Sequence, residues 1–166
     1  MRKIGFDGGH TVYELGPVSD VVLFFDCINT FVVSQDGDDW SLITDSLYRR
    51  YLKQDELERA SILMGKLQKN FLNLTASSVE WDEVFKGDRE LTWLDPEQGT
   101  LGAIFSRYFD LFSKAISSAI SFFVEFNIYQ PVRIVISDMP GFFIDRNRPL
   151  KDYDELVLDD YPFWLR

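Results

Sequence analysis

Carboxylates are the residues of this sequence most able to do chemistry, because 27 aspartates and glutamates stand against 17 lysines and arginines. Two carboxylates on different loops can act as general acid and general base, or can hold a divalent metal ion. No motif marks a pair among them, and with so many acids some pairs must approach one another by chance. A carboxylate- or metal-dependent hydrolase therefore stays open as an alternative function.

Nucleophilic catalysis lacks its usual components in this chain. His10 is the single histidine and lies in a glycine-rich segment that reads as a turn. A Ser-His-Asp or Cys-His arrangement would have to recruit it from the edge of the fold. Four serines repeat at helical spacing with no base nearby, which is typical of a helix face in solvent: Ser113, Ser117, Ser118 and Ser121. We expect no catalytic residue and no enzymatic activity.

Metal and cofactor motifs are missing as well. Cys27 is the single cysteine, which excludes an internal disulfide and a multi-cysteine zinc site, and its apolar surroundings predict a small buried residue. The acidic turn at residues 36–38 would need an acid at Leu47 and a glycine at Ser41 to be an EF-hand loop. The glycines match neither the dinucleotide fingerprint nor a P-loop. We expect no cofactor and no metal.

The net charge of −10 and the isoelectric point near 4.5 bear on the choice of partner. Nucleic-acid binding depends on basic side chains that displace counterions from phosphates, so direct binding of DNA or RNA is not expected. An acidic surface suits a basic protein, because a long-range field of opposite sign accelerates the encounter. Solubility alone is the other explanation of the charge.

Two irregular segments, residues 76–99 and 139–166, combine acids with aromatic side chains, and loops on a rigid scaffold often carry binding residues. The residues expected to contact a partner are Glu80, Trp81, Asp82, Glu83, Asp152, Tyr153, Asp154, Glu155, Asp159 and Asp160. Aromatics there would supply anchors, and acids would steer the approach. Alternatively, the aromatics cover the core and the acids are merely solvated. The turn with Asp36, Asp38, Asp39 and Trp40 is the next candidate.

The pattern along the chain indicates one domain over residues 1–166, without repeats or linkers. Residues 4–15 mix β-forming residues with glycines and predict a hairpin that turns near residues 7–9. Residues 18–34 are apolar and rich in β-branched and aromatic side chains; periodicity does not separate a buried strand from a buried helix, and we expect a strand. Residues 132–136 give the clearest strand, expected at the centre of the sheet because both faces are apolar.

Helical periodicity appears in three segments. Residues 40–53 and 57–74 place apolar side chains three or four positions apart, and a third stripe begins after Thr100 and runs to Phe123. Each stripe is expected to face the core. The sequence thus predicts an α+β fold, predominantly helical, with three long helices packed on a small β-sheet in one domain.

The chain shows no feature that would carry it into or across a membrane. Residues 4–9 contain glycines and Asp7 where a signal peptide needs an apolar core. The longest apolar segment, residues 101–129, is interrupted by Arg107, Asp110 and Lys114, which are costly at a bilayer centre. We expect a cytoplasmic protein that does not contact membranes.

Two parts of the chain carry a recognisable combination of residues. The first is SLYRRYL at residues 46–52, continued by DELE at 55–58 and by Met64 and Phe71. The second is PVRIVISDMP at residues 131–140, followed by RPL at 148–150, Tyr153, Asp154 and the closing PFWLR at 162–166. Together these parts, about half of the chain, resemble immunity proteins of bacterial contact-dependent growth inhibition systems.

The resemblance implies a small cytoplasmic protein that binds and neutralises the C-terminal toxin domain of a delivered effector, often a nuclease. It implies no individual functional residue, because such families vary the surface that meets each toxin. A nuclease that grips phosphates must be basic, so an acidic inhibitor is compatible with this role. A hydrolase and a structural scaffold subunit are the rival interpretations.

Overall fold

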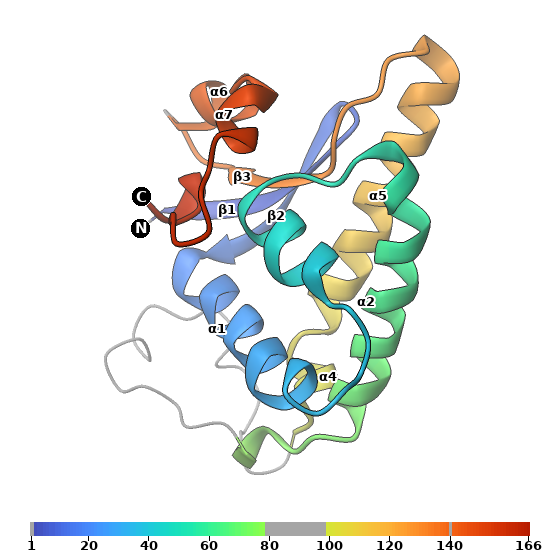
Figure 1. Cartoon of the computed structure of the whole chain (residues 1–166), viewed down its shortest axis with the longest axis vertical. Coiled ribbons are helices and arrows are strands. Elements are labelled where there is room, and N and C mark those ends of the chain that lie inside the picture. Colours follow the sequence, from blue (N-terminus) through green and yellow to red (C-terminus); the bar gives the residue numbers. More distant parts are fainter. Residues whose placement is uncertain (1, 79–98, 140) are drawn as a thin grey trace.

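A small antiparallel sheet and a set of helices make up the fold in the computed structural model, which describes residues 2–78, 99–139 and 141–166. The strands are β1 (Lys3–Gly8), β2 (Thr11–Pro17) and β3 (Arg133–Ile136). The helices are α1 (Val18–Ile28), α2 (Leu57–Leu72), α4 (Leu101–Ile104), α5 (Ser106–Phe126), α6 (Gly141–Arg146) and α7 (Leu150–Asp154). The expected α+β class with a helical majority is confirmed (Figure 1).

β1 is the middle strand of the sheet, whose order is β2-β1-β3. The predicted hairpin is confirmed, and Gly9 at φ +64° makes its turn between β1 and β2. The prediction that residues 132–136 form a central strand is wrong, because β3 is the edge strand of this order and, among the described residues, pairs within the sheet with β1 alone. α6 and the 3-10 turn Phe163–Leu165 pack against β3, which accounts for the burial of its apolar residues at the edge of the sheet.

The apolar run at residues 18–34 is a helix, and the prediction of a strand there is wrong. α1 begins after Pro17, whose backbone is extended, and is followed by π-helical hydrogen bonding over Asn29–Val33. Val21, Phe24 and Ile28 recur at helical steps and are each at most 1% exposed. α1 has 11 residues, about three turns of helix, and packing against the core outweighs the strand preference of its β-branched residues.

The stripe predicted for residues 40–53 is helical but shorter than expected. Its backbone is π-helical over Leu42–Leu47 and leaves the helix after Arg49. Trp40, Ile43 and Leu47 are buried, as the spacing predicted. The helix cannot continue to residue 53, because the amide of Leu52 donates to the carbonyl of Val132 at 2.8 Å and ties this segment to the start of β3.

α2 and α5 bury their predicted stripes over most of their length. The third stripe is divided at Phe105, which lies between the end of α4 at Ile104 and the start of α5 at Ser106. Thr100 caps α4 through its side-chain oxygen. Ile120, expected in the core, is 49% exposed. Ile120 lies at the level where α2 begins, and the last turns of α5 extend past that point (Figure 1).

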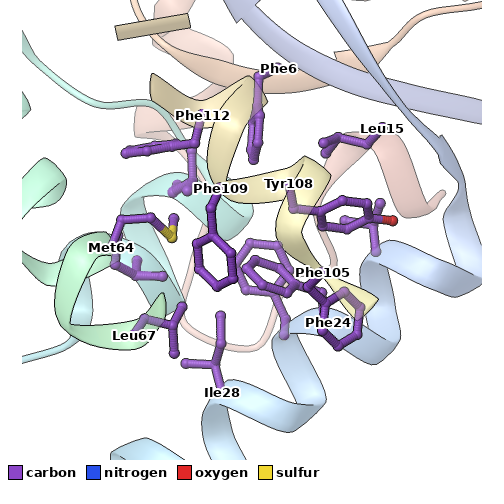
Figure 2. Packing of buried hydrophobic residues seen from close by; sticks show 14 of the residues in the cluster. Phe6, Leu15, Phe24, Ile28, Met64, Leu67, Phe105, Tyr108, Phe109 and Phe112 are labelled. Carbon is purple, nitrogen blue, oxygen red and sulfur yellow. The ribbon is translucent and has the colours of Figure 1, made fainter. Parts of the chain in front are cut away.

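Aromatic rings fill the centre of the core between α1, α2 and α5. The ring of Phe24 lies 5.1–6.0 Å from the rings of Phe71, Phe105, Tyr108 and Phe109, measured between centroids (Figure 2). Such edge-on and tilted pairs add to the free energy gained by burial alone. Cys27 is buried at 3% exposure, as predicted.

The serine face of α5 is partly covered by the hairpin. Ser113, Ser117 and Ser121 are exposed as predicted, but Ser118 is half-buried and donates a hydrogen bond of 2.8 Å to the carbonyl of Gly8. A side chain at Gly8 would collide with the backbone of α5, so glycine permits this close approach. Among the described residues no helix is long and apolar enough to cross a bilayer.

Residues 141–165 are more ordered than the predicted irregular tail. They form α6, α7 and the 3-10 turn Phe163–Leu165, which pack beside β3 at the end of the sheet where both chain termini lie (Figure 1). Arg2 donates to the carbonyl of Trp164 at 3.4 Å and so links the two termini.

Candidate protein-binding surface

The C-terminal loop, residues 155–161, follows α7 and is held by two consecutive arginines. The buried Arg49 donates through Nη1 to the carbonyls of Val157 at 2.8 Å and Asp160 at 3.3 Å, and also to that of Leu158. Arg50 donates to the carbonyl of Leu156 at 2.5 Å. A guanidinium carries five N–H donors in a fixed planar arrangement. The two guanidinium groups together can therefore hold this irregular backbone in one conformation.

The same arginines fix the end of α7 and are themselves positioned. Arg50 donates to the carbonyl of Tyr153 at 2.7 Å, and the hydroxyl of Tyr51 donates to the carboxylate of Asp154 at 2.8 Å. The carboxylate of Asp45 accepts from Nε of Arg49 at 2.8 Å and lies 3.7 Å from Nε of Arg50. The helical segment before residue 50 therefore serves as a rigid base for the loop.

Three apolar side chains of the loop point into solvent. Val157 is 65% exposed, Leu158 82% and Tyr161 69%. Sequence reasoning missed all three, because it selected this region for its acids. A usable signal was present, since the sequence LVLDDY places apolar residues directly beside acids in a segment with no helical or strand periodicity.

The predicted acids of this region divide by role. Asp154, Glu155 and Asp159 are exposed beside the apolar side chains. Asp160 is half-buried, and its carboxylate accepts a hydrogen bond of 2.9 Å from the amide of Val157, so it closes the loop. Asp152 is half-buried in the first turn of α7, where the helix dipole favours a negative charge.

Tyr153 was expected to be an exposed anchor, and this is wrong. It is 2% exposed, its ring lies 5.1 Å from the ring of Phe163, and the guanidinium of Arg133 lies 5.3 Å from its ring centroid. Burial raises the pKa of its phenol to about 12. Tyr153 therefore packs in the interior beneath α7, while Asp154 on the same helix is exposed.

Two other regions were predicted to contact a partner, residues 80–83 and the turn at residues 36–40. Glu80, Trp81, Asp82 and Glu83 lie outside the described residues. In the turn at residues 36–40, Trp40 is buried at 2% exposure and contributes to the core. Lys66 pairs with Asp36 and Asp38 in that turn, and Arg59 lies 3.7 Å from Asp38, so these two carboxylates already have basic partners within the chain.

Carboxylate chemistry would need free acids that face a cavity, and the two buried acids at the sheet are engaged. Asp7 lies 3.6 Å from Nε of Arg133 and 3.4 Å from Nε of Arg146. Asp145 accepts from the amide of Ile136 at 2.6 Å and lies 3.3 Å from Nε of Arg148, a pair within its own segment. No group of three or more potential metal ligands exists among the described residues.

These charges form a network that ties β1, β3 and α6 together. Arg133, 4% exposed, donates to the carbonyl of Arg148 at 3.0 Å and to that of Arg146. Burial raises the pKa of Asp7, while Arg146 and Arg133 oppose that shift. Arg133 therefore pairs with Asp7 on β1 and also holds the carbonyls at the end of α6. These contacts position the chain that leads into α7 and the C-terminal loop.

Comparison with known proteins adds no identification. No family model, no curated protein and no solved structure matches this chain.

Proposed function

We propose that this chain is a cytoplasmic immunity protein that binds the basic toxin domain of a contact-dependent growth inhibition effector through the C-terminal loop. One observation carries the proposal: Arg49 and Arg50 hold the loop by its carbonyls while Val157, Leu158 and Tyr161 stand exposed in a loop that also has exposed acids. A loop fixed in this way has little conformational entropy left to lose on binding.

The composition of the loop matches the anatomy of protein interfaces. Tyrosine is enriched among the residues that contribute most binding energy, and exposed apolar side chains on a rigid loop can fill a pocket on a partner. Asp154, Glu155 and Asp159 are exposed close to them in the sequence and would favour a basic surface. In a nuclease that surface is the groove that binds phosphates, so the loop would compete with the substrate.

Contacts between the two parts of the chain that resemble immunity proteins also support the proposal. Trp164 donates a hydrogen bond of 2.8 Å to the carbonyl of Tyr48, and their rings lie 5.4 Å apart. Leu52 bonds to Val132, and Arg49 and Arg50 bond to the tail. The residues behind the resemblance thus build the base of the C-terminal loop.

The test is co-expression with the cognate toxin domain, which we expect to be encoded directly upstream of this gene. Cells that make the toxin domain should grow when they also make the wild-type chain and should stop growing with the double variant Leu158→Asp and Tyr161→Ala. The double variant removes both anchors from solvent-exposed positions, so its melting temperature should match that of the wild type. Calorimetry with the purified toxin domain should show an affinity at least about tenfold weaker.

Ile144→Asp is the matched control, because Ile144 is an exposed aliphatic residue on α6, 69% accessible, outside the loop. It should protect cells like the wild type. Full protection by the double variant would place the interface elsewhere, and failure of the wild type to bind or protect would reject the immunity function.

A further inference from the structure

A shallow apolar groove runs between α2 and α5, on residues other than those of the C-terminal loop. Its lining includes Leu57, Glu58, Ser61, Ile62, Ile116 and Ile120. Ile62 and Ile120 are each 49% exposed, and Val124, one helical turn further along α5, is 78% exposed. Exposed apolar residues that gather in one place on a soluble protein mark interaction sites more often than isolated ones do.

Gly65 gives an independent observation on the same face of α2. It follows Glu58 and Ile62 at steps of four and three residues, so it lies on their side of the helix. Gly65 is exposed, and a Cβ added there would meet nothing within 4 Å. Glycine weakens a helix interior, and this chain's own packing does not require it here. Close approach of a partner's backbone would require it.

Negative charge collects at the end of the groove where α2 begins and α5 ends. Asp55 and Glu58 are exposed at the start of α2, and the last turn of α5 carries Glu125 and no basic residue. The carbonyl end of a helix is itself negative. Burial raises the pKa of Tyr129 just beyond α5, and Glu56 and Asp55 add to this shift, so their field reaches this end.

We propose that the α2–α5 groove binds an amphipathic helix of a partner protein, with lysine or arginine residues placed over Asp55, Glu58 and Glu125. A groove between two helices fits a third helix whose apolar residues recur at positions i, i+3, i+4 and i+7. A second copy of this chain is disfavoured as the occupant, because each copy carries a charge of −10 and would bring like charges together. Exposed Lys53 offsets one of the acids.

The probes are two synthetic helical peptides of about 16 residues, the length of α2. Both carry leucines at positions i, i+3, i+4 and i+7; one has lysines beside this face and the other has glutamates. The basic peptide should bind saturably, as followed by fluorescence anisotropy, and its NMR chemical-shift changes should map to α2 and the second half of α5. The acidic peptide should bind at least tenfold more weakly at low salt.

Four variants of the folded protein sharpen the test. Gly65→Gln and Ile62→Asp should each weaken binding of the basic peptide at least tenfold, while Asn70→Gln, an exposed change elsewhere on α2, should not. Glu58→Lys should reduce the difference in affinity between the basic and the acidic peptide. Gly65→Gln should also raise the melting temperature of the isolated protein, which shows that lost binding is not lost folding.

Several outcomes would overturn the proposal. Equal binding of the two peptides, shift changes outside α2 and α5, or no effect of Gly65→Gln would each do so. Self-association in sedimentation that Ile62→Asp abolishes would show that a second copy occupies the groove. Substitutions in the C-terminal loop should leave peptide binding unchanged, so this inference and the immunity function can fail separately.

Discussion

Arg49 shows how one residue can position a surface without belonging to it. The residue is 7% exposed, yet its charge faces Asp45 and its remaining donors meet carbonyls at the base of the C-terminal loop. A buried guanidinium costs desolvation free energy, and these hydrogen bonds offset that cost. The result is a loop whose backbone is fixed while Val157, Leu158 and Tyr161 stay exposed.

Arg49→Ala should lower the free energy of unfolding by about 2 kcal/mol, because the hydrogen bonds that this charged donor makes to the loop carbonyls are lost. Arg49→Lys should recover little, since an ammonium group cannot reproduce the planar fork. Urea unfolding measures both. Arg59→Ala is the control. Arg59 is half exposed and its contact with Asp38, at 3.7 Å, is a surface ion pair, so Arg59→Ala should lower the free energy of unfolding by less than about 1 kcal/mol. Equal losses in Arg49→Ala and Arg59→Ala would contradict this account of the loop.

At the scale of elements, Asp7 links β1 to β3 and α6 through Arg133 and Arg146. The folded state raises the pKa of Asp7 because burial outweighs both arginines. Asp7 therefore takes up a proton in the folded state at a pH where the unfolded chain, with a carboxyl pKa of about 3.9, remains ionised. This residue's contribution to stability falls as the pH rises from that value to the raised pKa, and is constant above it.

Asp7→Asn removes this titration, so the wild type minus variant difference in unfolding free energy should decrease across that window. Each pKa unit of elevation corresponds to about 1.4 kcal/mol. Urea unfolding of the wild type and of Asp7→Asn at a series of acidic pH values gives the difference directly. A difference that increases with pH would mean that the two arginines outweigh burial and lower the pKa.

An element could be predicted where its own residue spacing identifies it, and could not where its structure depends on packing against distant parts of the chain. α2 followed from its own spacing, because a polar face and an apolar face make the period visible. α1 did not, since a helix buried on most sides shows no period and its β-branched residues favour a strand. The edge position of β3 depends on what α6 covers, which is a property of tertiary packing.

The candidate surface was predictable only in part, for the same reason. Acids in the tail were visible in the sequence, but whether Tyr153 faces solvent depends on Phe163 and Arg133, which meet it only in the fold. The bonds from Arg49 and Arg50 span more than 100 residues of chain. No local pattern reports contacts of that range.

At the scale of the whole molecule, the charge of −10 acts mainly on the rate of encounter. Charge reversal of exposed acids in the C-terminal loop should therefore slow association with a basic toxin domain while the melting temperature stays almost unchanged. Asp159→Lys tests this at one position, and Asp110→Lys on α5 is the matched control with the same change in net charge. Stopped-flow measurements across ionic strengths give both the rate and its salt dependence.

Position should matter more than net charge if the loop is the interface. Asp159→Lys, and more so the double reversal with Glu155→Lys, should slow association by about tenfold at low salt and flatten its salt dependence, because the field is strongest where the surfaces meet. Asp110→Lys should change the rate little. A separate reversal of Glu80, Asp82 and Glu83 tests the other predicted region in the same assay. If both reversals leave the association rate and the protection of cells intact, the toxin meets a different face of the protein.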